Sequence, residues 1–166
     1  MQHLIIDGYN VIRQTSPYKE LAERDDLAHA RDMLLGDVAP LVTKTTRVTV
    51  VFDGTSNPTS TGAAQDYLGV QVIFSRKGYT ADSVIEKLSH EARAKGDAVE
   101  VVTSDATIQW TVMSSKVMRK SAREFGEELH GDAAEWQRDH RAQSTGATLA
   151  DQLSPESLAA LDKFSS

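Results

Sequence analysis

Three acidic residues that follow apolar runs are the side chains best placed to do chemistry. Asp7 follows the run at residues 4–6, Asp53 follows 48–52, and Asp105 comes shortly after 99–102. Such runs are typical of buried strands, and open α/β sheets build their sites at the carboxyl ends of strands. The sequence therefore predicts that these acids form one acidic, metal-binding pocket.

Further residues are candidates for the same pocket. Asp82 and Glu86 are four positions apart on a predicted helix, so their side chains share a face. Asn10 lies close to Asp7 in sequence and offers an amide that orients a water or a carboxylate. Phosphodiester hydrolysis uses clustered carboxylates, because the divalent ions that they hold activate water and neutralise charge on the phosphate. Each residue also has an ordinary structural explanation as a turn former, a helix cap or a surface charge.

Composition limits both the metal and the class of protein. The chain has 166 residues, no cysteine, 40% hydrophobic and 25% charged residues, and a net charge of −6. Without thiolates, oxygen or histidine must hold any metal, which favours Mg²⁺ or Mn²⁺. The negative charge argues against a nonspecific nucleic-acid coat protein, although clustered site carboxylates give a nuclease the same balance. With neither a membrane-spanning run nor a signal peptide, we expect a cytoplasmic protein with no membrane partner.

Basic residues late in the chain are candidates for contact with a phosphate backbone. They are Lys116, Arg119, Lys120 and Arg123. A basic surface beside acidic strand ends is what RNA binding would require, whereas the ordinary explanation is scattered surface charge. Tyr9, next to Asp7, is the better candidate for stacking on a base, and Ser104 for a hydrogen bond to a phosphate.

Strands and helices alternate through the first 112 residues, which favours parallel βαβ units with right-handed crossovers. Strands are expected at residues 3–6, 47–52, 70–74 and 99–103, with a strand or a loop within 114–120. Helices are expected from Asp25 or Asp26 to about Lys44, from Ala81 to Lys95 after a Thr80 cap, at 105–112, and over the polar stretch 121–143. Residues 9–24 are expected to form a loop, with or without a short helical turn, and residues 54–64 a polar loop.

Several segments occur in the order found in YacP-like NYN-domain proteins. They are residues 5–10, 30–32, 50–53, 69–74, 80–82, 102–105 with 109–110, and 119–124. The chain resembles this family, within the PIN-like nuclease superfold, over roughly residues 3–125. The resemblance implies an α/β fold of the PIN-like type, a three-layer α/β/α sandwich with a mostly parallel central sheet.

The resemblance also implies a function. It implies a metal-dependent endoribonuclease linked to ribosome-associated mRNA cleavage, so that RNA, mRNA above all, and the ribosome become candidate partners. By position it implies metal-binding catalytic acids at Asp7, Asp82 and Asp105, with Asn10, Asp53 and Ser104 in support. The stretch from Arg119 to Arg123 would then face RNA or the ribosome.

Two other functions are compatible with the same residues. One is an RNA- or ribosome-binding PIN-like module with little or no catalysis, and the other is a phosphohydrolase of small substrates. For domain organisation we expect a nuclease domain at residues 1–145 and a C-terminal tail at 146–166 with a short amphipathic helix. The sequence does not predict the RNA target, the number of metal ions or the oligomeric state.

Overall fold

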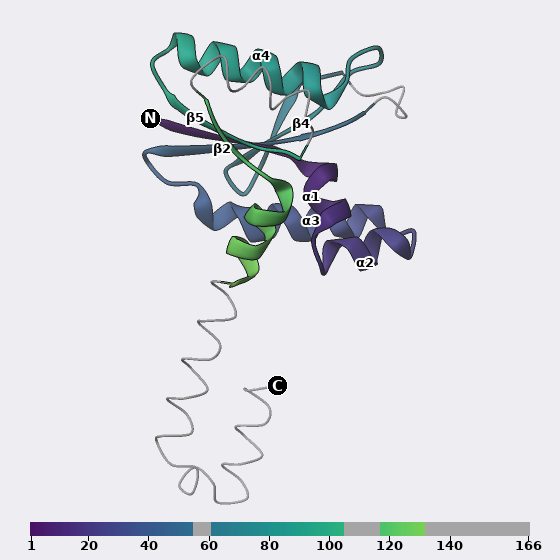
Figure 1. Cartoon of the computed structure of the whole chain (residues 1–166). Coiled ribbons are helices and arrows are strands. Elements are labelled where there is room, and N and C mark those ends of the chain that lie inside the picture. The colour runs from purple at the N-terminus through teal and green to yellow at the C-terminus, as the bar shows by residue number, and fades with distance from the viewer. Residues whose placement is uncertain (55–60, 105–116, 132–166) are drawn as a thin grey trace, which may run out of the picture. The chain divides into compact units, whose positions relative to one another are not determined.

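A six-stranded sheet forms the centre of the molecule in a computed structural model that describes residues 1–54, 61–104 and 117–131 (Figure 1). The strand order is β3-β4-β2-β1-β5-β6, and only β3 runs antiparallel to its neighbour. The elements are β1 (Gln2–Asp7), α1 (Gly8–Gln14), α2 (Tyr18–Glu23), α3 (Leu27–Val38), η1 (Ala39–Leu41), β2 (Thr46–Phe52), β3 (Ala64–Tyr67), β4 (Val70–Phe74), α4 (Ala81–Ala94), β5 (Ala98–Val102) and β6 (Met118–Lys120).

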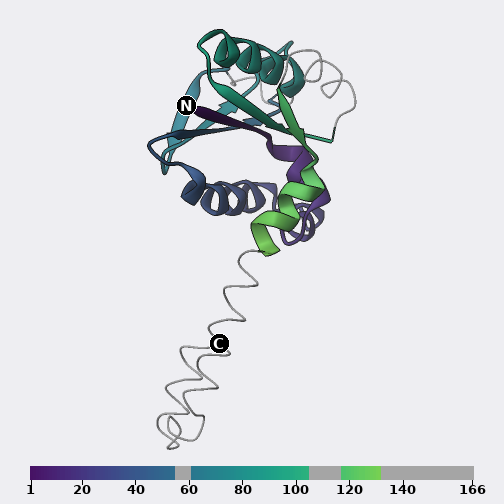
Figure 2. The same ribbon diagram turned by 60° about the vertical axis from the view of Figure 1, so that its left-hand side comes forward.

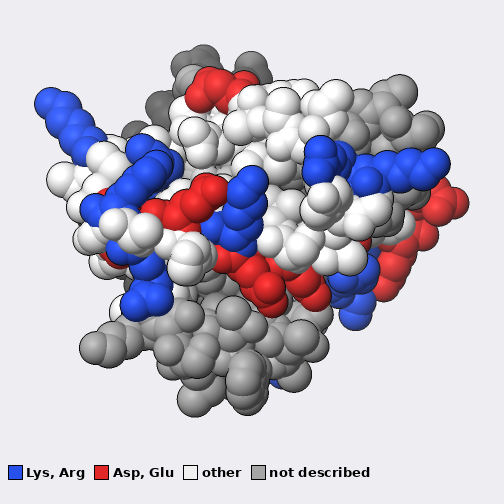
Figure 3. All heavy atoms as spheres, turned by 90° about the horizontal axis from the view of Figure 1, so that it is seen from above, with Lys and Arg blue, Asp and Glu red and all other residues white. Residues whose placement is uncertain are grey.

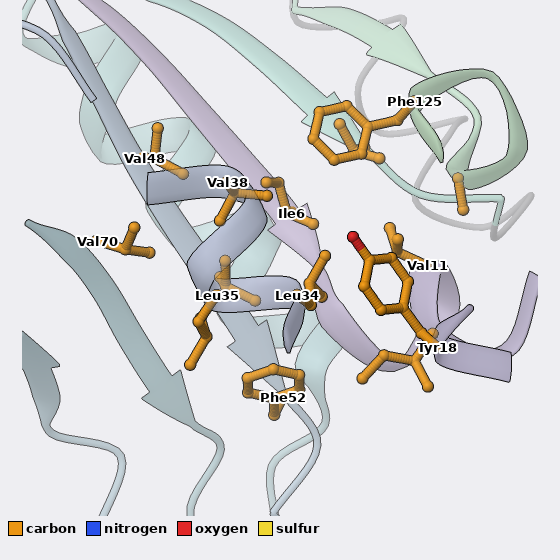
Figure 4. Packing of buried hydrophobic residues seen from close by; sticks show 14 of the residues in the cluster. Ile6, Val11, Tyr18, Leu34, Leu35, Val38, Val48, Phe52, Val70 and Phe125 are labelled. Atoms are coloured by element: carbon orange, nitrogen blue, oxygen red, sulfur yellow. The ribbon is translucent and has the colours of Figure 1, made fainter. Parts of the chain in front are cut away.

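Helices cover both faces of this sheet, which confirms the predicted three-layer α/β/α fold. Helices α1, α2 and α3 lie on one face and α4 on the other (Figures 1 and 2). Because neighbouring residues of a strand point to opposite faces, Ile6 packs with Leu34 and Phe52 on the first side (Figure 4), whereas Ile5 packs with Ile85 under α4. The strands β1, β2, β4 and β5 are therefore buried on both faces and read as mostly apolar runs.

The helical connections between the strands lie on opposite faces of the sheet on the two sides of β1. The chain passes from β1 to β2 through α1–α3 on one face, and from β4 to β5 through α4 on the other. Since β1 pairs with both β2 and β5, the strand order changes direction between β1 and β5. The carboxyl ends of the parallel strands at such a switch point are where open α/β sheets place their ligands.

The prediction for residues 9–24, a loop with or without a short helical turn, understated the helix, because α1 and α2 occupy most of this segment. Val11, Ile12 and Tyr18 are fully buried, and the Tyr18 hydroxyl donates a hydrogen bond to Asp37 at 2.6 Å. A Cβ atom at Gly8 would overlap the Phe52 ring, so only glycine allows α1 to start this close to β2. These helices are stabilised by tertiary packing, and they are too short to show a helical repeat of apolar residues in the sequence.

Other boundaries differ from the prediction for local reasons. α3 begins after the expected Asp26 cap but ends at Val38, where Pro40 falls within η1 and the α-helix cannot continue. The strand β3 was not predicted, because all its residues are exposed and no apolar alternation marks it. Residues 55–60 of the expected 54–64 loop and the whole expected helix 105–112 lie outside the described residues.

Three expectations about secondary structure are confirmed, and they concern α4, β6 and the helix after residue 121. α4 follows the Thr80 cap, which forms a capping box with Ser83, and β6 shows that a strand lies within residues 114–120. Residues 122–131 are helical, within the expected stretch 121–143. Residues Met1–Leu129 form one compact unit, and the predicted domain boundary after residue 145 falls outside the described residues. None of the helices in the described ranges has the length and apolar character of a membrane span.

Candidate active site

Polar side chains gather where the strands under α4 end. Residues two positions apart on a strand share a face, and the buried aliphatic residues Ile5, Val51 and Val101 pack in the cluster beneath α4. Two residues further along their strands stand Asp7, Asp53 and Thr103. These side chains therefore lie on the α4 face of the sheet at its carboxyl edge.

α4 brings Asp82 to the same edge. The helix runs against the direction of the strands, since it follows β4 and leads back to the start of β5 beside Gln2. Its first residue, Ala81, packs in the same cluster as Ile5, and Asp82 lies in its first turn. Thr80 and Ser83 already form the cap, so Asp82 is not needed to cap this helix.

Asp7 is the most constrained of these acids. It is 7% exposed, and it occupies the N-cap position of α1 without making a side-chain capping hydrogen bond. Instead, the Thr103 hydroxyl donates to its carboxylate at 3.4 Å across the switch point between β1 and β5. Burying a carboxylate is costly, so a buried acid at this edge that does not cap its helix points to a functional group.

Asn10 belongs to a hydrogen-bond network that joins three segments. Its side-chain oxygen accepts from the Ser104 amide at 3.2 Å and from the Gln14 side chain at 3.4 Å. The Ser104 hydroxyl in turn donates to Gln14 at 3.3 Å and accepts from the Ala122 amide at 3.1 Å. These bonds fix α1, the end of β5 and the start of the helical segment 122–131 against one another. Gln14 is a member of this network that no sequence pattern singled out.

Asp53 is held by a residue that the sequence analysis did not select. Ser75 is fully buried; its hydroxyl donates to the Asp53 carboxylate at 3.5 Å and accepts from the Gly54 amide at 2.9 Å. The sequence could have indicated Ser75. It lies two residues after the buried Ile73, so its side chain continues the alternation between the two faces of the sheet just beyond the end of β4.

Two of the predicted basic residues, Arg119 and Lys120, do not share one surface. Arg119 and Lys120 are neighbours on β6, so they point to opposite faces of the sheet. Lys120 contacts Glu128 at 2.6 Å and Glu100 at 3.5 Å. Burial alone would lower the pKa of Lys120, but the hydrogen bond to Glu128 and the charge of Glu100 raise it above its ordinary value. Lys120 thus already forms ion pairs with two carboxylates of the protein.

Two further candidates for RNA contact, Arg123 and Tyr9, are also engaged within the protein. Arg123 pairs with Glu127 at 3.3 Å on an exposed helix face. The Tyr9 ring packs 4.9 Å from the Phe52 ring, and its hydroxyl accepts from Arg31 at 3.1 Å. On the α4 side of the molecule, Lys and Arg are interspersed with Asp and Glu (Figure 3). A role for these side chains in RNA binding stays a prediction.

The oxygen donors at the carboxyl edge have the chemistry that Mg²⁺ and Mn²⁺ prefer. Within the described ranges no group of three or more His, Asp or Glu side chains is arranged to hold a metal ion. The third predicted ligand, Asp105, and the predicted RNA contact Lys116 both lie outside the described residues. Asp7 and Asp82 are therefore the two predicted ligands whose position is known, and metal binding stays a prediction.

Comparison with known proteins agrees with this architecture. The YacP-like NYN domain profile matches residues 4–166. A Bacillus subtilis (strain 168) protein described as uncharacterized protein YacP is 36% identical over 130 residues, covering 78% of this chain and 75% of the relative. A crystal structure of Rae1 (YacP) from Bacillus subtilis superposes with a TM-score of 0.66 at 32% identity, over 99% of this chain and 94% of that one.

A crystal structure of a point mutant of the same Bacillus subtilis protein also superposes with a TM-score of 0.66, at 34% identity over 85% of this chain and 82% of that chain. The match of the profile and the identity to YacP both extend over most of the chain. The sheet with its acidic carboxyl edge thus occurs in a nuclease-type RNase domain, and the chain belongs to the YacP-like NYN domain family.

Proposed function

We propose that this protein is a metal-dependent endoribonuclease that hydrolyses phosphodiester bonds of RNA. The observation that carries the proposal is the buried carboxylate of Asp7, which stands at the switch point of the sheet and takes no part in capping α1. Asp82 lies on the same face and edge, and membership of a nuclease-type family supports the same chemistry.

In this proposal Asp7 and Asp82, with Asp105 as the resemblance implies, hold Mg²⁺ or Mn²⁺. When bound, such an ion lowers the pKa of a water molecule and neutralises charge on the phosphate. The protein's own contribution is to fix its groups in advance: Thr103 orients the Asp7 carboxylate, and the amino end of α4 favours negative charge beside Asp82. The network around Asn10 holds the end of β5 beside α1.

We extend the proposal to mRNA as the substrate and the ribosome as a partner. The support is the resemblance in sequence, together with the length over which the chain matches the YacP-like NYN domain. Cleavage of a translated mRNA in a purified translation system, compared with the same mRNA without ribosomes, tests whether the ribosome is needed.

Cleavage of end-labelled RNA in the presence of Mg²⁺ or Mn²⁺ tests the proposed activity. The wild-type protein is expected to cut internally and to stop when the metal is chelated. Asp7→Asn is expected to lose at least about 100-fold in rate, as when one electrostatic contributor to a transition state is removed. The matched control is Asp66→Asn, which makes the same change on the exposed strand β3 and should cleave as the wild type does.

Two other outcomes would replace this proposal. Binding of RNA without cleavage under any metal condition would identify an RNA-binding module of the same fold. Hydrolysis of a chromogenic phosphodiester or a mononucleotide, without cleavage of longer RNA, would identify a phosphohydrolase of small substrates. Cleavage by Asp7→Asn at the wild-type rate would show that Asp7 is not part of the active site.

A further inference from the structure

A groove lies along the flank of α4, between this helix, the end of β4, the loop that connects them and residues 61–62 before β3. It encloses about 390 Å³. Its floor is aliphatic and includes Ile73 and Leu88, and its rim carries Arg76, Tyr79 and Lys87. The groove thus combines an apolar floor, an aromatic ring and two cations on a chain with a net charge of −6. None of these residues has a part in the site described above.

The aromatic ring of the groove is both exposed and held in place. Tyr79 is 45% exposed although it is a large side chain. The Arg76 guanidinium lies 4.3 Å from the centre of its ring, and the same group donates a hydrogen bond to the Tyr79 hydroxyl at 2.7 Å. An ordered, exposed ring paired with a cation is the arrangement on which bases of single-stranded nucleic acids stack.

The charges along the groove indicate where in it an anionic chain would bind. Ser83, Lys87 and Glu91 are spaced four residues apart on α4, so they form one stripe along its length, and all three line the groove. The stripe is positive in its middle and negative at the end remote from the start of the helix. An anionic chain would therefore lie over Arg76 and Lys87 and would end before Glu91.

The groove adjoins the acidic edge through two covalent links. Ser83 directly follows Asp82 in the first turn of α4. On the other side, Arg76 directly follows Ser75, whose hydroxyl bonds to Asp53. The loop of residues 75–80 thus begins at the residue that holds Asp53 and contributes Arg76 and Tyr79 to the groove, so the groove and the acids are neighbours along this loop.

We infer that this groove binds single-stranded RNA next to the bond that is cleaved, with a base on Tyr79 and phosphates beside Arg76 and Lys87. The inference rests on the proposed function, which it extends by naming where the substrate lies and that its flank is single-stranded. Stacking on a ring accepts any base, so the groove selects unpaired RNA rather than a sequence.

Binding of a short fluorescent single-stranded oligoribonucleotide to the Asp7→Asn protein, followed by anisotropy, tests the inference without cleavage. Tyr79→Ala is expected to weaken binding at least about fivefold, the lower range for loss of one stacked base. Lys87→Glu is expected to weaken binding and to reduce the slope of log affinity against log salt by about 0.7 or more. Tyr79→Phe keeps the ring and should keep the affinity.

Two control substitutions make the same chemical changes outside the groove. Tyr67→Ala removes a tyrosine that is 37% exposed on β3, and Arg93→Glu reverses a charge on the last turn of α4. Both are expected to bind as the Asp7→Asn parent does. Equal affinity of the groove variants and the parent, or equal losses in the groove and control variants, would overturn the inference, as would a parent with no affinity for the oligoribonucleotide.

Cleavage assays of the same substitutions in the wild-type protein separate this inference from the proposed function. If the wild type cleaves RNA and the groove variants bind normally, the groove assignment fails and the nuclease stands. If the groove variants lose binding while the wild type cleaves nothing, the groove stands and the nuclease fails.

Discussion

The two ends of β1 carry buried polar side chains of opposite character. His3 and Asp7 lie on the same face, under α4, and are 4% and 7% exposed. His3 Nε2 lies 2.7 Å from the Thr49 hydroxyl, which itself donates to Gln71, so the imidazole donates from Nε2, and its burial keeps it neutral by lowering its pKa. Asp7 is an acid at the carboxyl edge, where the crossover connections separate and α4 begins.

This difference shows that burial of a polar group does not by itself identify a site. His3 stands where β1 enters the sheet, beside the strand starts, and its hydrogen bond ties β1 to β2. Asp7 stands where the sheet opens at the switch point, which is where ligands reach such sheets. We therefore expect substitutions at the His3 end to change stability and substitutions at the Asp7 end to change activity.

The largest expected effect tests whether the acidic edge acts as one unit. Asp82→Asn should lower the cleavage rate at least about 100-fold, as we expect for Asp7→Asn, because both carboxylates are proposed to act on the same charge. The free energy of unfolding should change little, since Thr80 and Ser83 cap α4 without Asp82. Initial rates on labelled RNA, with Asp66→Asn as control, provide the measurement. Full activity of Asp82→Asn would show that α4 contributes no catalytic carboxylate to the site.

The next effect concerns pH and the His3 end. Burial, followed by the charge of Arg47, lowers the pKa of His3 from 6.5 to about 4. The unfolded chain therefore takes up the proton first, so stability is constant above pH 6.5 and falls as the pH drops toward 4. We expect His3 to account for a loss of about 2 kcal/mol between about pH 7 and pH 5.

Urea unfolding at about pH 7 and pH 5 measures this loss. His3→Leu should reduce the loss by about 2 kcal/mol relative to the wild type. His90→Leu removes an exposed histidine of α4 and is the control for the loss of an imidazole outside the core. The same pH dependence in all three proteins would show that His3 does not stay neutral in the fold.

The smallest effect compares the threonines that bind the two groups. Thr49→Val removes a hydroxyl next to His3 and should lower the free energy of unfolding by about 1 kcal/mol with no change in cleavage. Thr103→Val removes the hydrogen bond to Asp7 and should lower the cleavage rate about fivefold, the equivalent of about 1 kcal/mol. If Thr49→Val lowered activity as much as Thr103→Val does, the two ends of β1 would not differ as proposed.

Much of the sheet could be predicted because its strands are buried on both faces. The apolar runs of β1, β2, β4 and β5 indicated these strands, and the Thr80 cap indicated the start of α4. The acids that follow β1 and β2 could be found for the same reason. The edge strand β3 could not, since its exposed residues carry no pattern.

The features that the sequence patterns did not predict depend on tertiary contacts. The helix α1 depends on Gly8 fitting against Phe52, and the continuous helical segment 122–131 depends on Gly126, where a Cβ atom would overlap Thr15. The basic stretch suggested one surface, but once residues 118–120 form a strand, alternation separates Arg119 from Lys120. Contacts between distant residues of this kind leave no periodic trace in a single sequence.

The most direct test of the central claim is the binding of Mn²⁺ to the purified protein, followed by isothermal titration calorimetry. We predict that the wild type and Asp66→Asn bind Mn²⁺ alike and that Asp7→Asn binds at least about tenfold more weakly, since a hard cation loses a charged oxygen ligand. Equal affinity of Asp7→Asn and the wild type would contradict the assignment of the acidic edge as the metal site.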